Sequence, residues 1–423
     1  MTNISRLQTL RYTLHSNATT FTGAIAPASP TGVTPSVPVP LQITDEASSF
    51  LPRQRTPIDR SLRSLSGRRF PHVRGAQDVA DLTVATEFKG VNANTGAAVA
   101  DWEAKMEQGY LLASLFGAVA PATTGAAPTI AAAGHTPASG IVAFTAAANV
   151  QNGAVIAFAT SSGLQVGRVA SGGGAAATTV TLDHPYNGTP TNGATVFRFA
   201  VYSVSDSTTS HVHAFFTAEG EDWRRDYAGC APMSMNLGIP NAGSLTMSSV
   251  FSPTSWADIA ESNPAYADPT AGNPIVNDGA IFRLDNNEFL LRNATITYNC
   301  ATAIRETATK ANGRFGGVCG TGDGKSFMIE GELYISDAAT LGEIQDNGGT
   351  PTLPALLGSD VNAGQVSTQR EVVIQVGTEI GGCMYALLPT ADFRATVQTS
   401  GAFPVVKFQA MGTGALPAVL AVG

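Results

Sequence analysis

The chain has 423 residues, of which only 13% are charged, and its formal net charge is -8 at pH 7. This length is enough to bury a sizeable core and to form two or three domains. The negative charge argues against tight binding of nucleic acid by the whole molecule, because affinity for phosphates comes from clustered Lys and Arg. No zinc or thioredoxin-like motif is present, since the four cysteines contain no CxxC pair: Cys230, Cys300, Cys319 and Cys383.

The composition predicts a mainly β protein that associates with copies of itself. The 44 glycines, together with abundant Ala, Thr, Ser and Asn, are typical of many short strands and turns. Low charge suggests that neighbouring copies cover much of the surface, and a monomer solubilised by Ser, Thr and Asn is the alternative. The N-terminus lacks the order of a signal peptide, and no apolar run could span a bilayer, so we expect a soluble protein made in the cytoplasm.

Residues 1–77 are predicted to form an extended N-terminal arm. Five prolines between Ser16 and Pro40 disfavour regular structure there. Between Leu51 and Arg74, seven arginines stand against the single acid Asp59. We expect these arginines to pair with carboxylates of a neighbouring subunit, and contact with DNA phosphates is the alternative. They are Arg53, Arg55, Arg60, Arg63, Arg68, Arg69 and Arg74.

The next region predicts one strand and one helix. The run Asp78–Lys89 has apolar residues at nearly alternate positions, which indicates a strand with one irregular step. In the run Trp102–Val119, apolar residues recur at three- and four-residue spacing, which predicts a helix. Asp101 is its expected N-cap, and Gly117 is expected to end it.

Residues 126–200 are predicted to form a small inserted β domain. Short apolar runs alternate there with the turns Asn152-Gly153, Ser162-Gly163 and Asn187-Gly188, at the spacing of a small barrel or sandwich. The alternative is that these strands continue one larger sandwich.

Residues 201–423 predict further strands around one loop. The Pro-, Ser- and Asn-rich segment Pro253–Asp278 has poor helix and strand signals. In the run Lys325–Ser336, Phe327, Ile329 and Leu333 fall on one side of a strand, and polar residues fall on the other. Two or three more strands are expected in the C-terminal part, the last of them ending near Ala410.

No catalytic or cofactor motif is convincing. Gly324-Lys325-Ser326 is reminiscent of a phosphate-binding loop, but Cys319 stands where the first glycine is needed, and a strand pattern follows instead of a helix. His211 and His213 share one side of a strand without an obvious third metal ligand. The sequence therefore predicts no enzyme, no metal and no cofactor.

The stretch His211–Phe251 has the order strand, aromatic-glycine corner, long strand, and this order resembles the tail tube proteins of long-tailed bacteriophages. A helix that ends in Leu-Leu, a small residue and Gly, as in Leu111–Gly117, also fits that family. The resemblance covers about residues 78–120 and 203–415. The matching residues of the central element are Tyr227, Gly229, Met233, Met235, Leu237, Gly243, Leu245, Thr246, Met247 and Phe251.

The resemblance implies a fold and a function. It implies a tail-tube-type β-sandwich or partial barrel with one flanking helix, formed by residues 78–125 and 201–423. Copies of the chain would form rings, with six subunits favoured and three as the alternative, and these rings would stack into a tube in the virion tail and contact other tail proteins. Double-stranded DNA would pass through the tube without specific binding. The inserted domain would then lie on the outer surface of the assembly.

The resemblance also implies roles for particular residues. Ring-to-ring contacts would use the arginine-rich arm, the Pro253–Asp278 loop and Trp256. The channel would lack clusters of basic residues and would present acidic or neutral side chains that repel DNA phosphates. A tail-tip, baseplate or capsid-decoration protein, with residues 141–200 as its recognition module, is the alternative, and an enzyme comes third. The expected channel-facing residues are Glu219, Glu330, Glu332 and Glu379.

Overall fold

The computed structural model is mainly β, which confirms the predicted fold class. One α-helix is present among the residues that it describes. These are residues 9–14, 34–43, 54–58, 73–78, 81–91, 94–97, 105–117, 119–120, 125–204, 213–219, 224–253, 255–259, 272–285, 287–306, 314–318, 324–334, 344, 369–398, 405–414 and 416–423.

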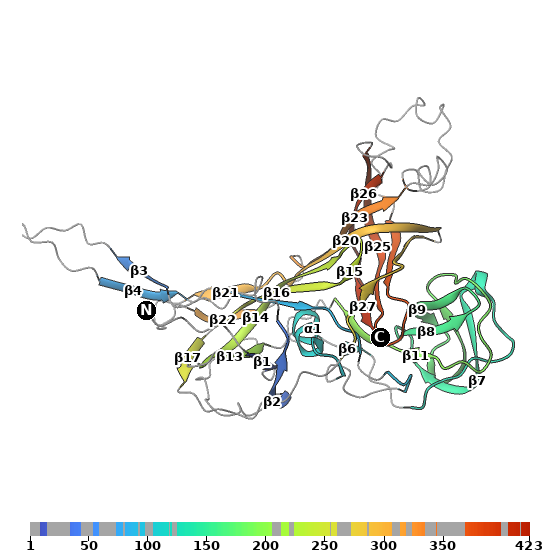
Figure 1. Cartoon of the computed structure of the whole chain (residues 1–423), viewed down its shortest axis with the longest axis horizontal. Coiled ribbons are helices and arrows are strands. Elements are labelled where there is room, and N and C mark those ends of the chain that lie inside the picture. The colour runs from blue at the N-terminus through green and yellow to red at the C-terminus, as the bar shows by residue number, and fades with distance from the viewer. Residues whose placement is uncertain are drawn as a thin grey trace, which may run out of the picture.

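The largest sheet contains 16 strands (Figure 1). In spatial order its main path is β2 (Thr34–Leu41), β1 (Thr9–Leu14), β13 (Ala214–Glu219), β14 (Arg224–Ile239), β20 (Asn287–Asn299), β19 (Ile281–Leu284), β24 (Gln369–Val376), β25 (Met384–Gln398), β27 (Val419–Val422), β12 (Ala200–Ser203) and β6 (Val119–Ala120). Off this path are β5 (Leu82–Glu87), β16 (Thr246–Ser252), β17 (Ser255–Ile259), β23 (Ser326–Tyr334) and β26 (Val405–Gly412).

Three small pairs of strands lie outside the large sheet. They are β3 (Gln54–Ile58) with β4 (Val73–Asp78), β15 (Gly243–Ser244) with β18 (Val276–Asn277), and β21 (Ala303–Glu306) with β22 (Arg314–Val318). In Figure 1 the β3–β4 hairpin projects to the left, away from the rest of the molecule.

Six strands of the large sheet close into a barrel. Following the pairings, β19 is joined to β20, then β23, β26, β25, β24 and back to β19. Closure is possible because β20 and β25 each pair with two different strands along one edge. Residues 287–290 of β20 pair with β19 and residues 294–299 pair with β14, while β25 pairs first with β27 and then with β26.

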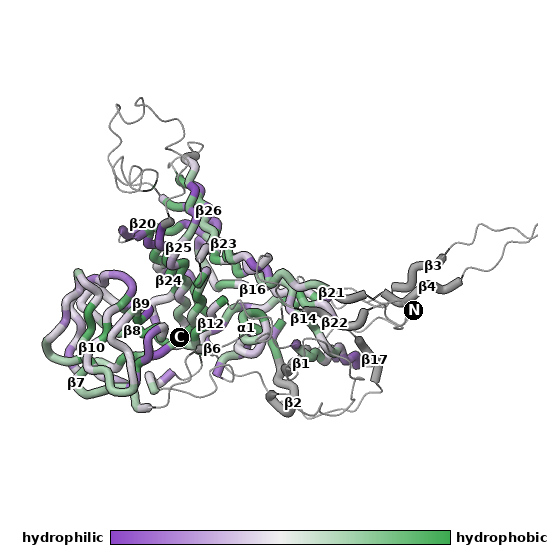
Figure 2. The backbone as a smooth tube through the Cα atoms, turned by 180° about the vertical axis from the view of Figure 1, so that it is seen from behind, coloured by the Kyte–Doolittle hydropathy of each residue, from purple (hydrophilic) through white to green (hydrophobic). Residues whose placement is uncertain are grey.

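The barrel interior is filled by aromatic side chains that belong to the main core. Phe408 lies 4.6 Å from Phe282 and 6.0 Å from Phe393, measured between ring centroids. Burial of such rings is among the largest single contributions to a β core. Figure 2 shows hydrophobic stretches of β24 and β25, on the side of the large sheet next to the domain that contains β7–β10 (residues 141–182).

Strand β14 bends within its length, at the aromatic-glycine corner noted in the sequence. Gly229 has a φ of +61°, a backbone conformation that residues with a Cβ adopt only at a cost. Before the glycine, β14 pairs with β13 and β17; after it, β14 pairs with β16 and β20. One strand therefore carries four neighbours, two on each side of the bend.

The helix α1 (Gly109–Phe116) covers the apolar side of the sheet. Phe116 stacks on Tyr298 of β20 with 4.7 Å between ring centroids. Gly117 ends the helix with a φ of 90°, as predicted, but the helix is shorter than the expected Trp102–Val119. The two residues just before the helix contact the strand β5 region instead. Glu107 pairs with Lys89 at 2.6 Å, and Gln108 donates to the Glu87 carbonyl at 2.7 Å. The expected N-cap Asp101 lies outside the described residues.

Residues 126–200, called the module below, form a separate five-stranded sheet with its own core. The sheet order is β11-β8-β9-β10-β7, and a short 3-10 helix, η2 (Pro137–Ser139), precedes β7. A cluster of buried side chains that includes Ile130, Phe158 and Tyr186 lies wholly within these residues. The strands are β7 (Ile141–Val150), β8 (Val155–Thr160), β9 (Gly163–Ser171), β10 (Gly174–Leu182) and β11 (Phe197–Arg198).

Arg198 ties the root of the module to the main body. Its side chain is buried, has no carboxylate partner among the described residues, and donates instead to backbone carbonyls of Gly96 at 2.9 Å, Ala126 at 3.3 Å and Asn149 at 2.9 Å. Burial lowers the pKa of its guanidinium from the usual value. Several carbonyl dipoles thus replace the hydration of one buried charge.

Three expectations about chain organisation are corrected by the structure. Residues 1–77 are not only an arm, because β1 and β2 extend the large sheet through pairing of β1 with β13. The Pro253–Asp278 segment is not only a loop, because β17 adds to β14. The chain does not finish its strands near Ala410, because β27 pairs with both β25 and β12. In each case the deciding contact is a pairing with a distant strand, which local propensity does not report.

We predict that Gly229→Ala lowers the free energy of unfolding by about 1–2 kcal/mol, because a Cβ at positive φ carries a steric cost of this size. Chemical denaturation followed by tryptophan fluorescence measures the effect. Gly174→Ala in β10 is the matched control, since a Cβ there meets nothing within 4 Å and its φ is ordinary. Equal stability of the two variants would contradict the proposed strain at the bend.

Candidate functional site

Five neighbouring strands present polar side chains on the same side, and these line an open groove of about 660 Å³. The strand registers explain the arrangement, because one row of partners runs from Thr295 to Glu330, Gln409 and Arg394. We call this surface the polar face. It consists of Asn236 of β14, Asn293, Thr295 and Thr297 of β20, Glu330 and Glu332 of β23, Arg394 and Thr396 of β25, and Lys407 and Gln409 of β26.

The alternate residues of the same strands point into the core. Ile296, Ile329 and Ala410 are fully buried and form a row of register partners behind the polar face. Successive side chains of a strand point to opposite sides of the sheet, so buried and outward-facing residues alternate when one side is buried. The predicted division of β23 is confirmed for Phe327, Ile329 and Leu333, which are all buried. The polar face is thus anchored directly on the main core and on the barrel.

The carboxylate of Glu332 is the centre of charge on the polar face. It accepts hydrogen bonds from Arg292 Nη1 at 3.0 Å and Asn293 Nδ2 at 3.2 Å, and Lys407 Nζ lies 3.7 Å away. Exposed ion pairs of this kind add little stability, but they hold the cations beside an acid. Arg292 and Lys407 thus share one carboxylate, and the neighbouring Glu330 supplies the second negative charge that balances them.

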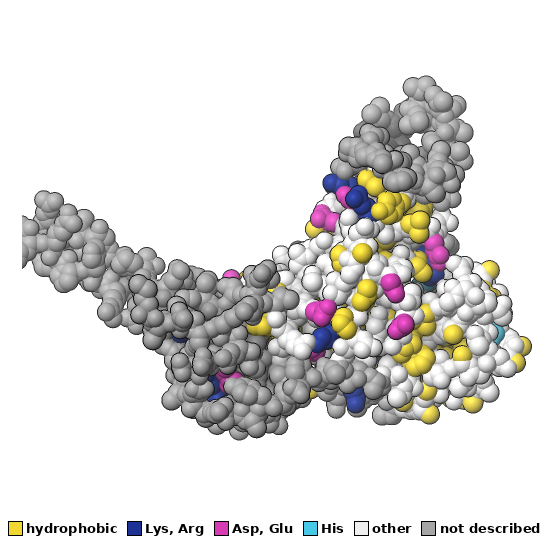
Figure 3. Space-filling view, viewed as in Figure 1, with side chains coloured by type: hydrophobic (Ala, Val, Ile, Leu, Met, Phe, Trp, Pro, Cys, Tyr) yellow, Lys and Arg dark blue, Asp and Glu magenta, His cyan; other side chains and the backbone are white. Residues whose placement is uncertain are grey.

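The other charged groups of the polar face are also partnered. Glu330 accepts a hydrogen bond from Gln409 Nε2 at 2.6 Å, and Arg394 donates to Asp392 at 3.0 Å. Two carboxylates and two cations line the groove among otherwise neutral amide and hydroxyl groups. Figure 3 shows the same character on one side of the molecule, where charged side chains are scattered among uncharged groups. The face is polar, with its charges compensated.

The structure brings together two of the four acids predicted to face a channel. Glu330 and Glu332 are neighbours on the polar face. Glu379 is exposed in the turn between β24 and β25 and does not line the groove. The prediction for Glu219 needs correction, because its side chain is buried and lies 3.8 Å from Arg224. Glu219 lies in β13, in an apolar part of the sheet. A carboxylate buried there needs a cation beside it, and the sequence alone did not show that this residue is buried.

Three of the eight predicted subunit-contact residues lie in described strands. Arg55 lies in β3, Arg74 in β4, and Trp256 in β17, where its backbone pairs with Tyr227. Their side chains, and the whole of Arg53, Arg60, Arg63, Arg68 and Arg69, lie outside the described part of the chain, as do His211 and Cys319.

Several polar-face residues escaped the sequence analysis. Thr295 and Thr297 alternate with buried residues in β20, and Lys407 and Gln409 do so in β26. This alternation is visible in the sequence, but it does not reveal that the strands lie side by side. A search for polar alternation in all strands would have found the residues, though not the groove.

Comparison of the chain with models of known protein families and with curated proteins finds no match. Within the described ranges, no helix is long and apolar enough to cross a membrane. Nor do those ranges contain a group of three or more His, Cys, Asp or Glu residues placed to hold a metal ion.

We predict that Glu332→Lys converts the polar face into a DNA-binding surface. The change adds a cation and frees Arg292 and Lys407, so the slope of log K against log salt for duplex DNA should steepen by about two to three. Affinity at low salt should rise by about tenfold or more. Fluorescence anisotropy of a labelled duplex measures both quantities.

Glu379→Lys is the matched control, because it makes the same change of charge on an exposed turn. It should change the salt slope by about one. If the two variants bind DNA equally, the compensation seen around Glu332 does not govern the behaviour of the polar face.

Proposed function

We propose that this chain is a structural subunit of a bacteriophage tail tube, in which copies assemble into stacked rings around a channel for DNA. The observation that carries the proposal is the polar face. A surface that DNA must slide past needs to be wettable and free of unpaired cations, because each uncompensated Lys or Arg adds attraction to phosphate. Arg292 and Lys407 lie beside Glu332, and the two acids Glu330 and Glu332 together balance these two cations, which fits this requirement.

The proposed mechanism is physical and involves no catalysis. The channel inferred from sequence was expected to present acidic or neutral side chains. Glu332 is held by two cations and Glu330 by an amide. We therefore propose a neutral surface that neither attracts nor strongly repels phosphate. Localisation to the virion tail, assembly in the host cytoplasm, hexameric rings and contacts with other tail proteins all form part of this proposal.

The second candidate is a tail-tip, baseplate or capsid-decoration protein. The observation in its favour is the module, which has its own sheet and its own core and could act as a recognition domain. Such a protein would assemble only on its scaffold. The two candidates therefore differ in whether the purified chain forms tubes by itself.

We predict that the purified chain forms hollow tubes or stacked rings in negative-stain electron microscopy as its concentration rises. Within those tubes, a Thr297→Cys variant should react with a small maleimide but not with a large polymer-linked maleimide, because the channel would exclude the polymer. Thr178→Cys on the exposed side of β10 is the matched control and should react with both reagents. Single chains at all concentrations would contradict the tube proposal and favour the second candidate.

A further inference from the structure

The module docks on the barrel through an apolar interface. Val155, Ala157 and Val166 of the module form one buried cluster with barrel and neighbouring residues. The cluster is separate from the module's own core and from the main core. The module also contributes Phe199, which follows β11, and the members outside the module are Val201, Val373, Cys383, Tyr385, Leu387, Val419 and Ala421.

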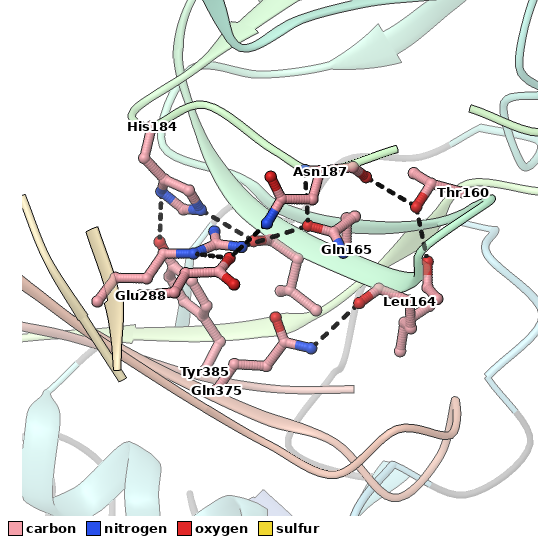
Figure 4. A network of polar contacts seen from close by, with 11 residues as sticks. Thr160, Leu164, Gln165, His184, Asn187, Glu288, Gln375 and Tyr385 are labelled. Carbon is pink, nitrogen blue, oxygen red and sulfur yellow. Dashed lines mark hydrogen bonds and ion pairs between the residues drawn. The ribbon is translucent and has the colours of Figure 1, made fainter. Parts of the chain in front are cut away.

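A network of polar groups surrounds this apolar centre (Figure 4). Arg283 of β19 donates to Glu288 at 2.5 Å and to Gln165 of the module at 3.3 Å. Asn187 of the module donates its side-chain amide to Glu288 at 2.9 Å. Gln375 of β24 donates to the Leu164 carbonyl at 3.3 Å. The module is thus held by oriented hydrogen bonds beside an apolar contact.

Glu371 of β24 lies on the side of that strand that faces the module. The alternation fixes its direction, because Val372 and Ile374 belong to the main core while Val373 belongs to the interface cluster. Among the described residues, every nearby arginine already has another acid: Arg283 pairs with Glu288, Arg168 with Asp183 at 3.0 Å, and Arg370 with Asp285 at 2.8 Å. An ionised Glu371 would therefore be a largely buried charge without its own cation.

The groups around Glu371 shift the pKa of its carboxyl in opposite directions. Burial is the main cause that raises the pKa of its carboxyl, to about 8, and Asp183 and Asp285 raise it further, while Arg283 and Arg168 act against them. His184 of the module is buried beside Tyr385, and burial together with Arg283 lowers its pKa to about 3, so it stays neutral. Burial raises the pKa of Asp183 despite Arg168, and raises the pKa of Tyr385 well above its usual value.

We propose that the carboxyl group of Glu371 makes the docking of the module on the barrel depend on pH. The module is held when this carboxyl is neutral and loosens when it ionises and releases its proton to solvent. Repulsion from Asp183, which the module itself carries across the interface, then adds to the cost of the buried charge.

The direction of the effect follows from the raised pKa. In the undocked state Glu371 would be exposed, with a pKa near the usual glutamate value of 4.5, whereas in the docked state the pKa is about 8. The docked state therefore binds the extra proton between these two values. Docking is strongest below the lower value, weakens by at most about tenfold per pH unit as pH rises, and reaches its minimum above the higher value.

Cys383 provides a direct measurement of docking in the full chain. It is fully buried in the interface cluster, so an alkylating reagent reaches it only when the module moves away. The alkylation rate is read by peptide mass spectrometry and divided by the rate for the denatured chain at the same pH. Cys300, buried in the main core, reports global unfolding in the same digest. We expect the normalised rate at Cys383 to rise by about tenfold or more between pH 6 and 8, with no matching rise at Cys300.

Glu371→Gln keeps the shape of the side chain and removes its titration, so its normalised rate at Cys383 should stay flat over this range. Glu379→Gln, on the exposed turn of the same hairpin, is the matched control and should keep the rise of the unaltered chain. Asp183→Asn should move the midpoint to lower pH, because it removes a neighbouring acid and frees Arg168. A pH-dependent rise that persists unchanged in Glu371→Gln, or no rise in the unaltered chain, would overturn the proposal.

Discussion

The bend of β14 at Gly229 is the constraint on which the rest of the fold depends. The first half of the strand holds β13 and β17, and the second half holds β16 and β20. A residue with positive φ between the halves changes the course of the strand while keeping its hydrogen bonds to both sets of neighbours. β20 then carries the sheet into the barrel, so the bend orients the sheet with respect to the barrel.

The barrel and the polar face are two consequences of the same alternation. Along β20, β23 and β26, one set of residues fills the core with Ile296, Ile329 and Phe408, and the other set faces outward with Thr, Glu, Lys and Gln side chains. Rigid packing behind the face fixes the positions of its charged groups. This explains how Glu332 meets Arg292 and Lys407, which come from two different strands, at ion-pair distances. A neutral polar surface thus follows from strand register.

The sequence predicted local features better than long-range ones. The alternation of β23, the glycine stop of α1 and the turns of the module follow from short-range periodicity and turn chemistry, and the structure contains them. Barrel closure was not predictable, because pairing of β19 with β24 joins residues about ninety positions apart through register that no local pattern encodes. Pro389 illustrates the difference. Proline disfavours the interior of a strand, but Pro389 lies inside β25, at a register shift opposite β24 where a missing N–H is tolerated.

In the proposed tube, the polar face lies toward the channel and the module lies away from it. The most direct test is a helical reconstruction of the assembled chain by cryo-electron microscopy. We predict that Thr295, Glu330 and Gln409 line the bore and that the module forms the outer surface. A reconstruction in which the polar face is buried between subunits, or in which the module occupies the bore, would contradict it.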